Sequence, residues 1–400
     1  MRLVIYTGKG GTGKTVNACS TALRLSDLRY ETLLISSDPA HTLSDALMVG
    51  EIEGKSTRIS TDLYAAQVVP VTEMDSHFKT ILSYFASFFL SKGIDDTLSY
   101  ELAMLPGMTQ LFFLLKIEES VRTGEFDAII LDMPASGEAM RYLYFPKLIG
   151  SLSMKLSGLA GLVSGFGRLL EPYFSGTPLS GVLIKTEADL LHRLEELSKL
   201  IFDPKITSLR IAANADTFSM ENAKRTLMSA NLYGINVDMV IINKIMPQSQ
   251  SKDSFFVDWA DFQNARVTEA KSSFYSLPVM EIPLYREELK GIDMLKHNAE
   301  VLFGDQDPSQ IFYRGRVFEF NSDSSSLTLK LKVPFTQNED FLVERISDQV
   351  TVKVATNIGY IVNVIPLPAV TLGMTLKNAR LSDHELAISF ERVSENKKES

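Results

Sequence analysis

The chain has 400 residues, 45% hydrophobic and 22% charged, which is typical of a globular protein of two or three domains and excludes a disordered or fibrous one. A net charge of −9 argues against a broad nucleic-acid-binding surface, so we expect no nucleic-acid partner. The single cysteine, Cys19, excludes a disulfide framework and any zinc or iron–sulfur site that needs several thiolates from one chain.

The first residues leave no room for a secretory signal, because Leu3–Thr7 already has the pattern of a buried strand. The most apolar later stretch, Leu148–Gly167, contains Lys155, four serines and five glycines, which is too polar for a transmembrane helix. We therefore expect a cytoplasmic protein, or one in an equivalent reducing compartment.

The first 45 residues predict a strand, a glycine-rich turn over 8–13, a helix over 15–28 and a second strand over 32–36. Helical patterns separate the later strand candidates. These candidates are residues 63–69, 128–131, 206–213, 237–242 and 278–282. Alternation of this kind predicts an α/β fold with a doubly wound parallel sheet.

Two mainly helical stretches, about 73–124 and 147–202, interrupt this alternation and are rich in Phe, Leu and Met. We interpret them as a helical insert within a domain spanning residues 1–304. Three readings of their apolar side chains stay open: ordinary core, an adaptable groove that shields a hydrophobic protein client, or a surface that docks on a membrane. The few basic residues in 147–202 make any membrane contact indirect or peripheral at most.

The composition changes near Gly304. Residues 305–315 have the pattern of a linker, and strict alternation of apolar and polar residues then recurs within 316–392. This predicts a small all-β antiparallel sandwich. The charged residues 393–400 predict a disordered tail.

The turn after the first strand matches the phosphate-binding pattern G-x-x-x-x-G-K-[ST]. Backbone amides of such a loop and the following helix N-terminus surround phosphate oxygens. We expect Lys14 to reach the β- and γ-phosphates of ATP and the Thr15 hydroxyl to join the shell of Mg²⁺. The expected nucleotide-binding residues here are Gly8, Gly10, Gly11, Thr12, Gly13, Lys14, Thr15 and Val16.

Two acidic residues follow predicted strands that end beside this loop. We expect Asp38 to orient the attacking water, although Asp38 or Ser44 could instead cap a helix. The apolar run 128–131 ends in Asp132, which we expect to hold Mg²⁺ through water. Residues 133–137 then predict either a glycine-hinged loop that senses the γ-phosphate or a plain loop.

These motifs resemble the ArsA-type ATPase family, which includes arsenite-pump ATPases and chaperone ATPases that target tail-anchored membrane proteins. The resemblance covers about residues 1–300. It rests on the Gly-Lys-Gly-Gly-Thr-Gly-Lys-Thr string, the segment from Ser37 to Asp45, Pro106-Gly107, Val240–Lys244 and Ile282–Gly291.

The resemblance implies a homodimer in which Lys9 reaches the partner subunit's nucleotide as a further catalytic lysine. It also implies that Asn243 reads the adenine edge and that Pro283, Leu284 and Tyr285 flank the base. The β-rich C-terminal region resembles the α-crystallin sandwich, as in a subgroup of the family. The zinc-clasp Cys-x-x-Cys of the eukaryotic targeting ATPases is absent, and Glu138 stands where the family's sensor loop has histidine.

The sequence thus predicts a Mg²⁺-dependent homodimeric ATPase whose opening and closing controls binding of a hydrophobic client. Two alternatives are a non-catalytic ATP-dependent switch or scaffold, and the ATPase subunit of an anion pump. A membrane-positioning ATPase of the Min type is disfavoured, because such proteins use a C-terminal amphipathic helix and this C-terminal region has a strand pattern.

Overall fold

The computed structural model describes residues 1–37, 42–52, 56–68, 106–157, 192–247, 254–274, 277–315, 318–322, 326–334, 340–346, 349–356, 359–371 and 373–392. Asp38, the parts of the expected helical insert at 73–105 and 158–191, and the expected tail 393–400 lie outside them. The chain divides into two compact units. The first unit combines Met1–Thr207 with Tyr285–Gln310, and the second combines Ser208–Leu284 with Ile311–Ser400.

The sheet strands of the first unit follow the order β3-β4-β2-β5-β1. Their bounds are β1 (Arg2–Gly8), β2 (Thr32–Ser36), β3 (Thr57–Ser60), β4 (Leu63–Gln67) and β5 (Ala128–Ala135). All neighbours are parallel except β3, which is antiparallel to β4. β2 is buried along its whole length and β1 beyond its first residue, as expected for strands covered on both faces.

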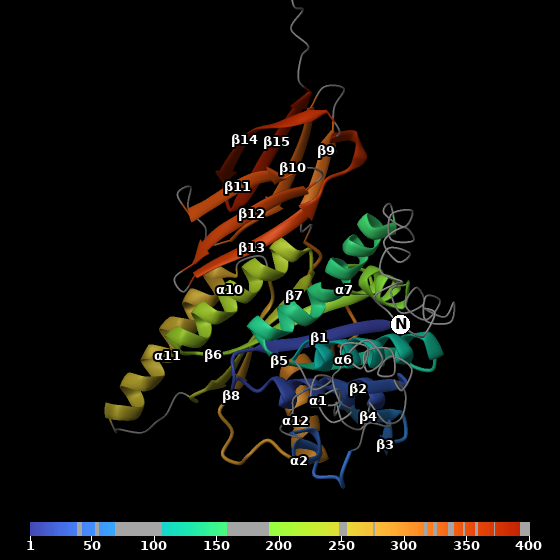
Figure 1. The fold of residues 1–400 in the computed structure, drawn as a ribbon. Helices are drawn as coiled ribbons and strands as arrows, with labels where there is room; N and C mark the ends of the chain where they lie inside the picture. The colour runs from blue at the N-terminus through green and yellow to red at the C-terminus, as the bar shows by residue number, and fades with distance from the viewer. Residues whose placement is uncertain are drawn as a thin grey trace, which may run out of the picture. The chain divides into compact units, whose positions relative to one another are not determined.

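Helices cover the strands of the first unit (Figure 1). They are α1 (Lys14–Asp27), α2 (Thr42–Leu47), α6 (Pro106–Thr123), α7 (Ser136–Ser157), a helix over 192–201, and α12 (Ile292–Phe303). α12 packs along α1, although more than 250 residues separate them in sequence, as the contact between Lys296 and Asp27 shows.

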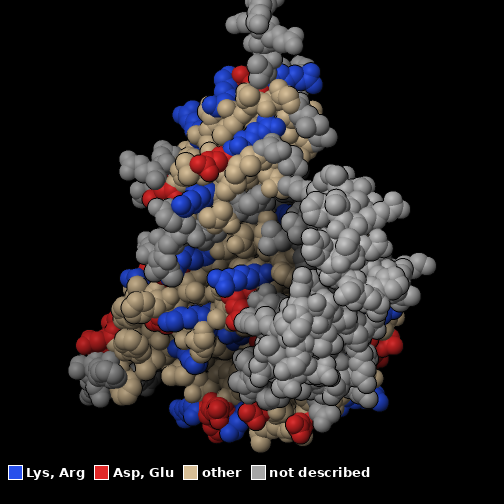
Figure 2. Space-filling view, in the orientation of Figure 1, with Lys and Arg blue, Asp and Glu red and all other residues tan. Residues whose placement is uncertain are grey.

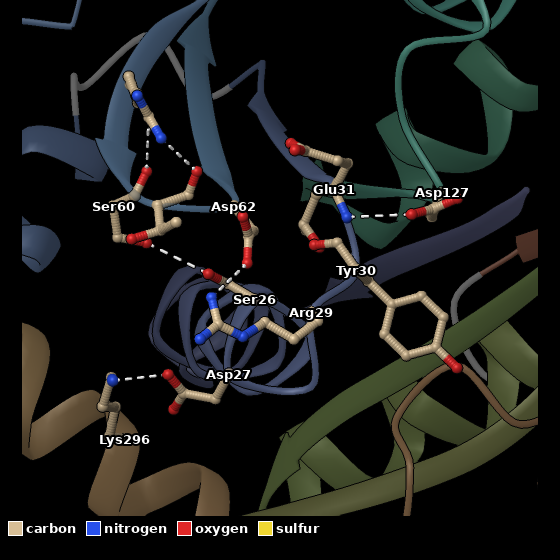
Figure 3. A network of polar contacts seen from close by, with 12 residues as sticks. Ser26, Asp27, Arg29, Tyr30, Glu31, Ser60, Asp62, Asp127 and Lys296 are labelled. Carbon is tan, nitrogen blue, oxygen red and sulfur yellow. Dashed lines mark hydrogen bonds and ion pairs between the residues drawn. The ribbon is translucent and has the colours of Figure 1, made fainter.

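Polar contacts fix the carboxyl end of α1 to its surroundings in the first unit (Figure 3). Lys296 Nζ lies 2.7 Å from Asp27 Oδ1, and Arg29 Nη1 lies 3.3 Å from Asp62 Oδ2. The Glu31 amide donates to Asp127 Oδ2 at 3.1 Å. These contacts lie at the surface, so they orient the helix end more than they stabilise the fold.

The second unit begins with the parallel strands β6 (Thr207–Asn214), β7 (Val237–Ile245) and β8 (Val279–Pro283) and the helices α10 (Thr217–Tyr233) and α11 (Ser254–Ser273). The Asp216 side chain caps α10 by accepting from the Ser219 amide at 2.8 Å. Gly234 ends the same helix with a φ of 87°, a conformation that favours glycine.

In the C-terminal part of the second unit, the described residues form two antiparallel sheets with the strand orders β14-β15-β10-β9 and β11-β12-β13. Their bounds are β9 (Phe318–Ser322), β10 (Ser326–Lys332), β11 (Phe341–Ile346), β12 (Gln349–Thr356), β13 (Gly359–Pro366), β14 (Met374–Ser382) and β15 (Glu385–Arg392). A short 3₁₀ turn, Ala369–Thr371, lies between β13 and β14.

The two antiparallel sheets share one apolar core with α10 (Figure 1). Alternate residues of β10, β12 and β15 are fully buried, and Met228 and Leu232 of α10 complete the cluster. This confirms the predicted fold class: a mostly parallel sheet with helices, followed by an antiparallel β region.

Acidic and basic side chains alternate over the described surface in view, with no extended patch of one sign (Figure 2). In the ranges that the structure describes, no helix is both long enough and apolar enough to cross a membrane.

Candidate functional site

The predicted phosphate loop joins the end of β1 to the start of α1. Gly11 and Gly13 have φ values of 78° and 84°, which favour glycine because a β-carbon would strain this conformation. Gly13 occupies the N-cap position of α1, and no side chain caps the helix. The first amides of α1 are therefore available to an anion, and the helix dipole adds to their positive potential.

The lysines of this loop differ in their surroundings. Lys9 is exposed, and its carbonyl oxygen accepts from the Thr12 hydroxyl at 2.8 Å. Lys14 Nζ donates to the same carbonyl at 3.4 Å. The ammonium group of Lys14 thus lies against the backbone of the loop, whereas Lys9 is at the surface.

Asp132 lies fully buried on β5, the central strand between β1 and β2. Its Oδ2 accepts from the Thr15 hydroxyl at 2.8 Å and from the Ser36 hydroxyl at 3.0 Å. A carboxylate beside a threonine hydroxyl is an oxygen donor set of the kind that Mg²⁺ prefers. The residues present therefore fit the expected magnesium ion.

Sequence reasoning did not single out Ser36. Its partner, Asp132, is 96 positions away in the chain and reaches it only because β2 and β5 pair in parallel, with Ser36 opposite Asp132. The available signal was a small hydroxyl residue at the predicted end of a buried strand. Asp38 lies outside the described residues, but the amide of its neighbour Ser37 donates to the Asp132 carbonyl at 3.2 Å.

Cys19 packs in the buried face of α1. Burial, and secondarily the negative charge of Asp132, raise the pKa of the Cys19 thiol well above its usual value. The thiol is therefore neutral and unreactive at physiological pH, as expected for a core side chain.

The segment 133–137 differs from the expected loop. β5 continues to Ala135, which pairs with Gly8, and α7 begins at Ser136. The strand extends because the pairing with β1 resumes beyond Asp132. Glu138, in the first turn of α7, accepts from the Tyr142 hydroxyl at 2.9 Å, and this contact with burial raises the pKa of Tyr142.

Of the expected base-binding residues, Asn243, Pro283 and Leu284 lie at the ends of β7 and β8 in the second unit. Asn243 is buried, and its Oδ1 accepts from the Lys244 amide at 2.8 Å. Gln263 of α11 contacts the backbone just after Asn243. Its Nε2 donates to the Lys244 carbonyl at 3.3 Å, and its Oε1 accepts from the Met246 amide at 2.7 Å.

Pro283 pairs with Ile245, and the Leu284 amide donates to the Ile245 carbonyl at 2.7 Å. Tyr285, the next residue, belongs to the first unit, and its hydroxyl donates to Asn298 Oδ1 at 3.3 Å. The phosphate- and metal-binding candidates Lys9, Lys14, Thr15 and Asp132 also lie in that unit.

Comparisons with known proteins agree with this geometry. The family model of the anion-transporting ATPases (ArsA ATPase) matches residues 1–304. A protein of Aquifex aeolicus named as an arsenical pump-driving ATPase is 28% identical over 97% of this chain and 99% of its own length. A protein of Chlorobaculum tepidum with the same kind of name is 30% identical over 98% of this chain and 96% of its own. The ATPase GET3 of Rhodotorula glutinis is 27% identical over 74% of this chain and 86% of its own length.

Together with the phosphate loop and the buried carboxylate beside it, these matches confirm the resemblance seen in the sequence. The chain is an ATPase and belongs to the anion-transporting (ArsA) ATPase family.

Proposed function

We propose that this chain is a cytoplasmic, Mg²⁺-dependent, homodimeric ATPase that uses ATP cleavage to control the binding of a hydrophobic client. The observation that supports Mg²⁺-dependent ATP cleavage is the hydrogen bond from the Thr15 hydroxyl, at the start of α1, to the buried Asp132 carboxylate. In this proposal residues 1–304 form the ATPase domain, 305–315 a linker and 316–392 a β-sandwich.

In the proposed reaction, the backbone of the loop, the lysine side chain and the metal-holding residues have separate roles. The amides of Gly8–Val16 bind the phosphates, and Lys14 moves from the Lys9 carbonyl to the γ-phosphate, where it neutralises charge that develops during cleavage. Bound Mg²⁺ would supply positive charge beside the phosphates. Asp132 and Thr15 hold it, and the buried Ser36 hydroxyl orients the carboxylate.

Asp38 would position the attacking water. An unperturbed aspartate has a pKa of about 3.9, so at neutral pH it orients the water by accepting a hydrogen bond more than it takes up a proton. Asn243, Pro283, Leu284 and Tyr285 would bind the base. The exposed Lys9 would neutralise the partner subunit's nucleotide, which makes turnover depend on dimer formation.

The hydrophobic client is proposed from the apolar stretches 73–124 and 147–202 and from the resemblance to the targeting ATPases. The names of two relatives favour a second candidate, an ATPase subunit that drives an arsenical pump. Stimulation of turnover by arsenite would support this candidate, whereas stimulation by a detergent-solubilised transmembrane peptide would support the client.

Steady-state ATP hydrolysis with Lys14→Ala and Asp38→Asn tests the proposal. Lys14→Ala removes a positioned charge at the phosphates, and Asp38→Asn removes the charge that orients the water. Each loss should cost about 3 kcal/mol of transition-state stabilisation, so we expect turnover to fall about 100-fold in each variant. Lys290→Ala is the matched control, since Lys290 is exposed and pairs with its near neighbour Glu288 at 2.8 Å. Wild-type turnover in both variants would contradict the proposed site.

Light scattering tests the dimer. The proposal requires two copies per particle when ATP and Mg²⁺ are present, and a Lys9→Ala variant that still dimerises but hydrolyses ATP slowly. A wild-type chain that stays monomeric under these conditions while cleaving ATP would contradict the role of Lys9.

A further inference from the structure

A buried polar bridge joins α1 to α12 within the first unit. Asn298 of α12 is fully buried, and its Nδ2 donates to Asn17 Oδ1 at 3.3 Å and to Ser20 Oγ at 2.9 Å. Asn17 and Ser20 are themselves fully buried on α1. Asn17 lies only two residues beyond Thr15, in the first turn of the helix that begins at the phosphate loop.

The same side chain reaches the expected base-binding segment. Asn298 Oδ1 accepts from the Tyr285 hydroxyl at 3.3 Å. The Tyr285 ring also lies edge-on to His297, with 5.8 Å between ring centroids. Burial raises the pKa of Tyr285, so the hydroxyl keeps its proton and remains a donor at neutral pH.

Burying polar side chains between two helices is less favourable in free energy than burying apolar ones. The remaining buried residues of α12 include Leu295, Ala299 and Leu302, and a leucine at position 298 would extend that apolar face. A buried carboxamide must instead satisfy both its donor and its acceptor, and it favours one relative position of the groups that it joins. In Asn298 the amide nitrogen donates to α1 and the amide oxygen accepts from Tyr285, so both groups have partners.

We propose that Asn298 is a positioning residue that holds Tyr285 at a fixed place relative to the phosphate loop, and so sets the affinity for the base of ATP without acting in cleavage. This inference rests on the proposed function, because it takes Tyr285 to flank the base. Triphosphate and base are covalently linked, so the nucleotide binds best when its two subsites keep the matching separation.

The experiment uses two ligands, ATP and inorganic tripolyphosphate, which carries the phosphates but no base. Their dissociation constants are measured by calorimetry with Mg²⁺, together with kcat and KM for ATP. For Asn298→Leu we expect the dissociation constant and KM of ATP to rise about tenfold, the effect of one lost buried hydrogen bond. Affinity for tripolyphosphate and kcat should stay within twofold of wild type.

Lys296→Ala is the matched control. Lys296 lies on α12 and pairs with Asp27 of α1 at 2.7 Å, so the variant removes a surface contact between the same two helices (Figure 3). It should leave both dissociation constants unchanged.

Two outcomes overturn the inference. An equal loss of affinity for ATP and tripolyphosphate would show that Asn298 only packs the helices, and an unchanged ATP affinity would show that the bridge does not act on the base. If Asn298→Leu does not fold, Ser20→Ala decides alone, because it removes one oxygen atom and with it an α1 partner of Asn298, and it should raise the dissociation constant of ATP but not that of tripolyphosphate. Failure of the proposed function looks different: wild type would then bind neither ligand, or Lys14→Ala would hydrolyse ATP normally.

Discussion

The place where β2 and β5 pair at Ser36 and Asp132 buries side chains of a different character from the core of the C-terminal sheets. Asp132 and Ser36 are fully buried and bond to each other. In the C-terminal core, the buried positions of β10 are Leu327, Leu329 and Leu331. Buried charge with polar partners adds little net stability, whereas buried apolar area is the main source of it. Chemistry and stability are thus located in different regions, and substitutions in each should have different readouts.

The largest expected effect is on stability. Phe390 is fully buried in the C-terminal core, and the Arg345 guanidinium lies 5.6 Å from its ring centroid. Phe390→Ala should lower the free energy of unfolding of this region by about 3–5 kcal/mol, measured by urea denaturation. Turnover per folded molecule should not change at a temperature where the variant is folded. A turnover loss there would mean that the two regions are functionally coupled.

Ser36→Ala tests the buried polar contact between β2 and β5. Removing one hydroxyl from the buried Asp132 carboxylate should cost about 1.5 kcal/mol of interaction and lower ATP turnover about tenfold. Ser120→Ala is the control, since Ser120 is also buried and its hydroxyl donates to the Lys116 carbonyl of the same helix, α6, at 2.8 Å. Equal turnover in the two variants would contradict the assigned role of Ser36.

A smaller effect depends on pH. Burial lowers the pKa of Lys147 from 10.5 to about 8, and its ammonium group lies 4.7 Å from the Phe202 ring centroid. Between these two pKa values the unfolded chain binds more protons than the folded chain, so wild-type stability rises with pH across this window. Lys147→Met removes the dependence. We expect the variant to be more stable than wild type at neutral pH, with the difference shrinking as pH rises from about 8 to 10.5.

The smallest expected effect comes from removing an ion pair on the surface of the C-terminal region. Lys330 pairs with Glu385 at 3.0 Å, and this contact raises the pKa of the exposed lysine. Solvent screens such a pair, so Lys330→Ala should leave the urea midpoint and the turnover within experimental error. A measurable loss of stability would show that solvent does not fully screen this ion pair.

Local patterns predicted the parts of this molecule that are contiguous in sequence. The loop Gly8–Thr15 and the strand that carries Asp132 are such parts, because the residue types and the chemistry coincide there. Alternation also identified the inward-facing residues of β10, β12 and β15. It could not give the strand orders, because a period of two sets the face of a residue and not its neighbouring strand.

The contacts that sequence reasoning missed join distant segments. Asn298 meets Ser20 across 278 positions, and each residue alone has the pattern of an ordinary helix position. The extension of β5 to Ala135 was missed for the same reason, since it depends on the pairing with Gly8. Such contacts arise only once the strands and helices are packed.

The most direct test is ATP turnover as a function of Mg²⁺ concentration in wild type and in Asp132→Asn, a change that keeps the shape of the side chain but removes its charge. If Asp132 holds the metal ion beside Thr15, the variant will need at least about tenfold more Mg²⁺ for half-maximal turnover and will reach a lower maximum. The same Mg²⁺ dependence and maximal turnover in both proteins would contradict the account.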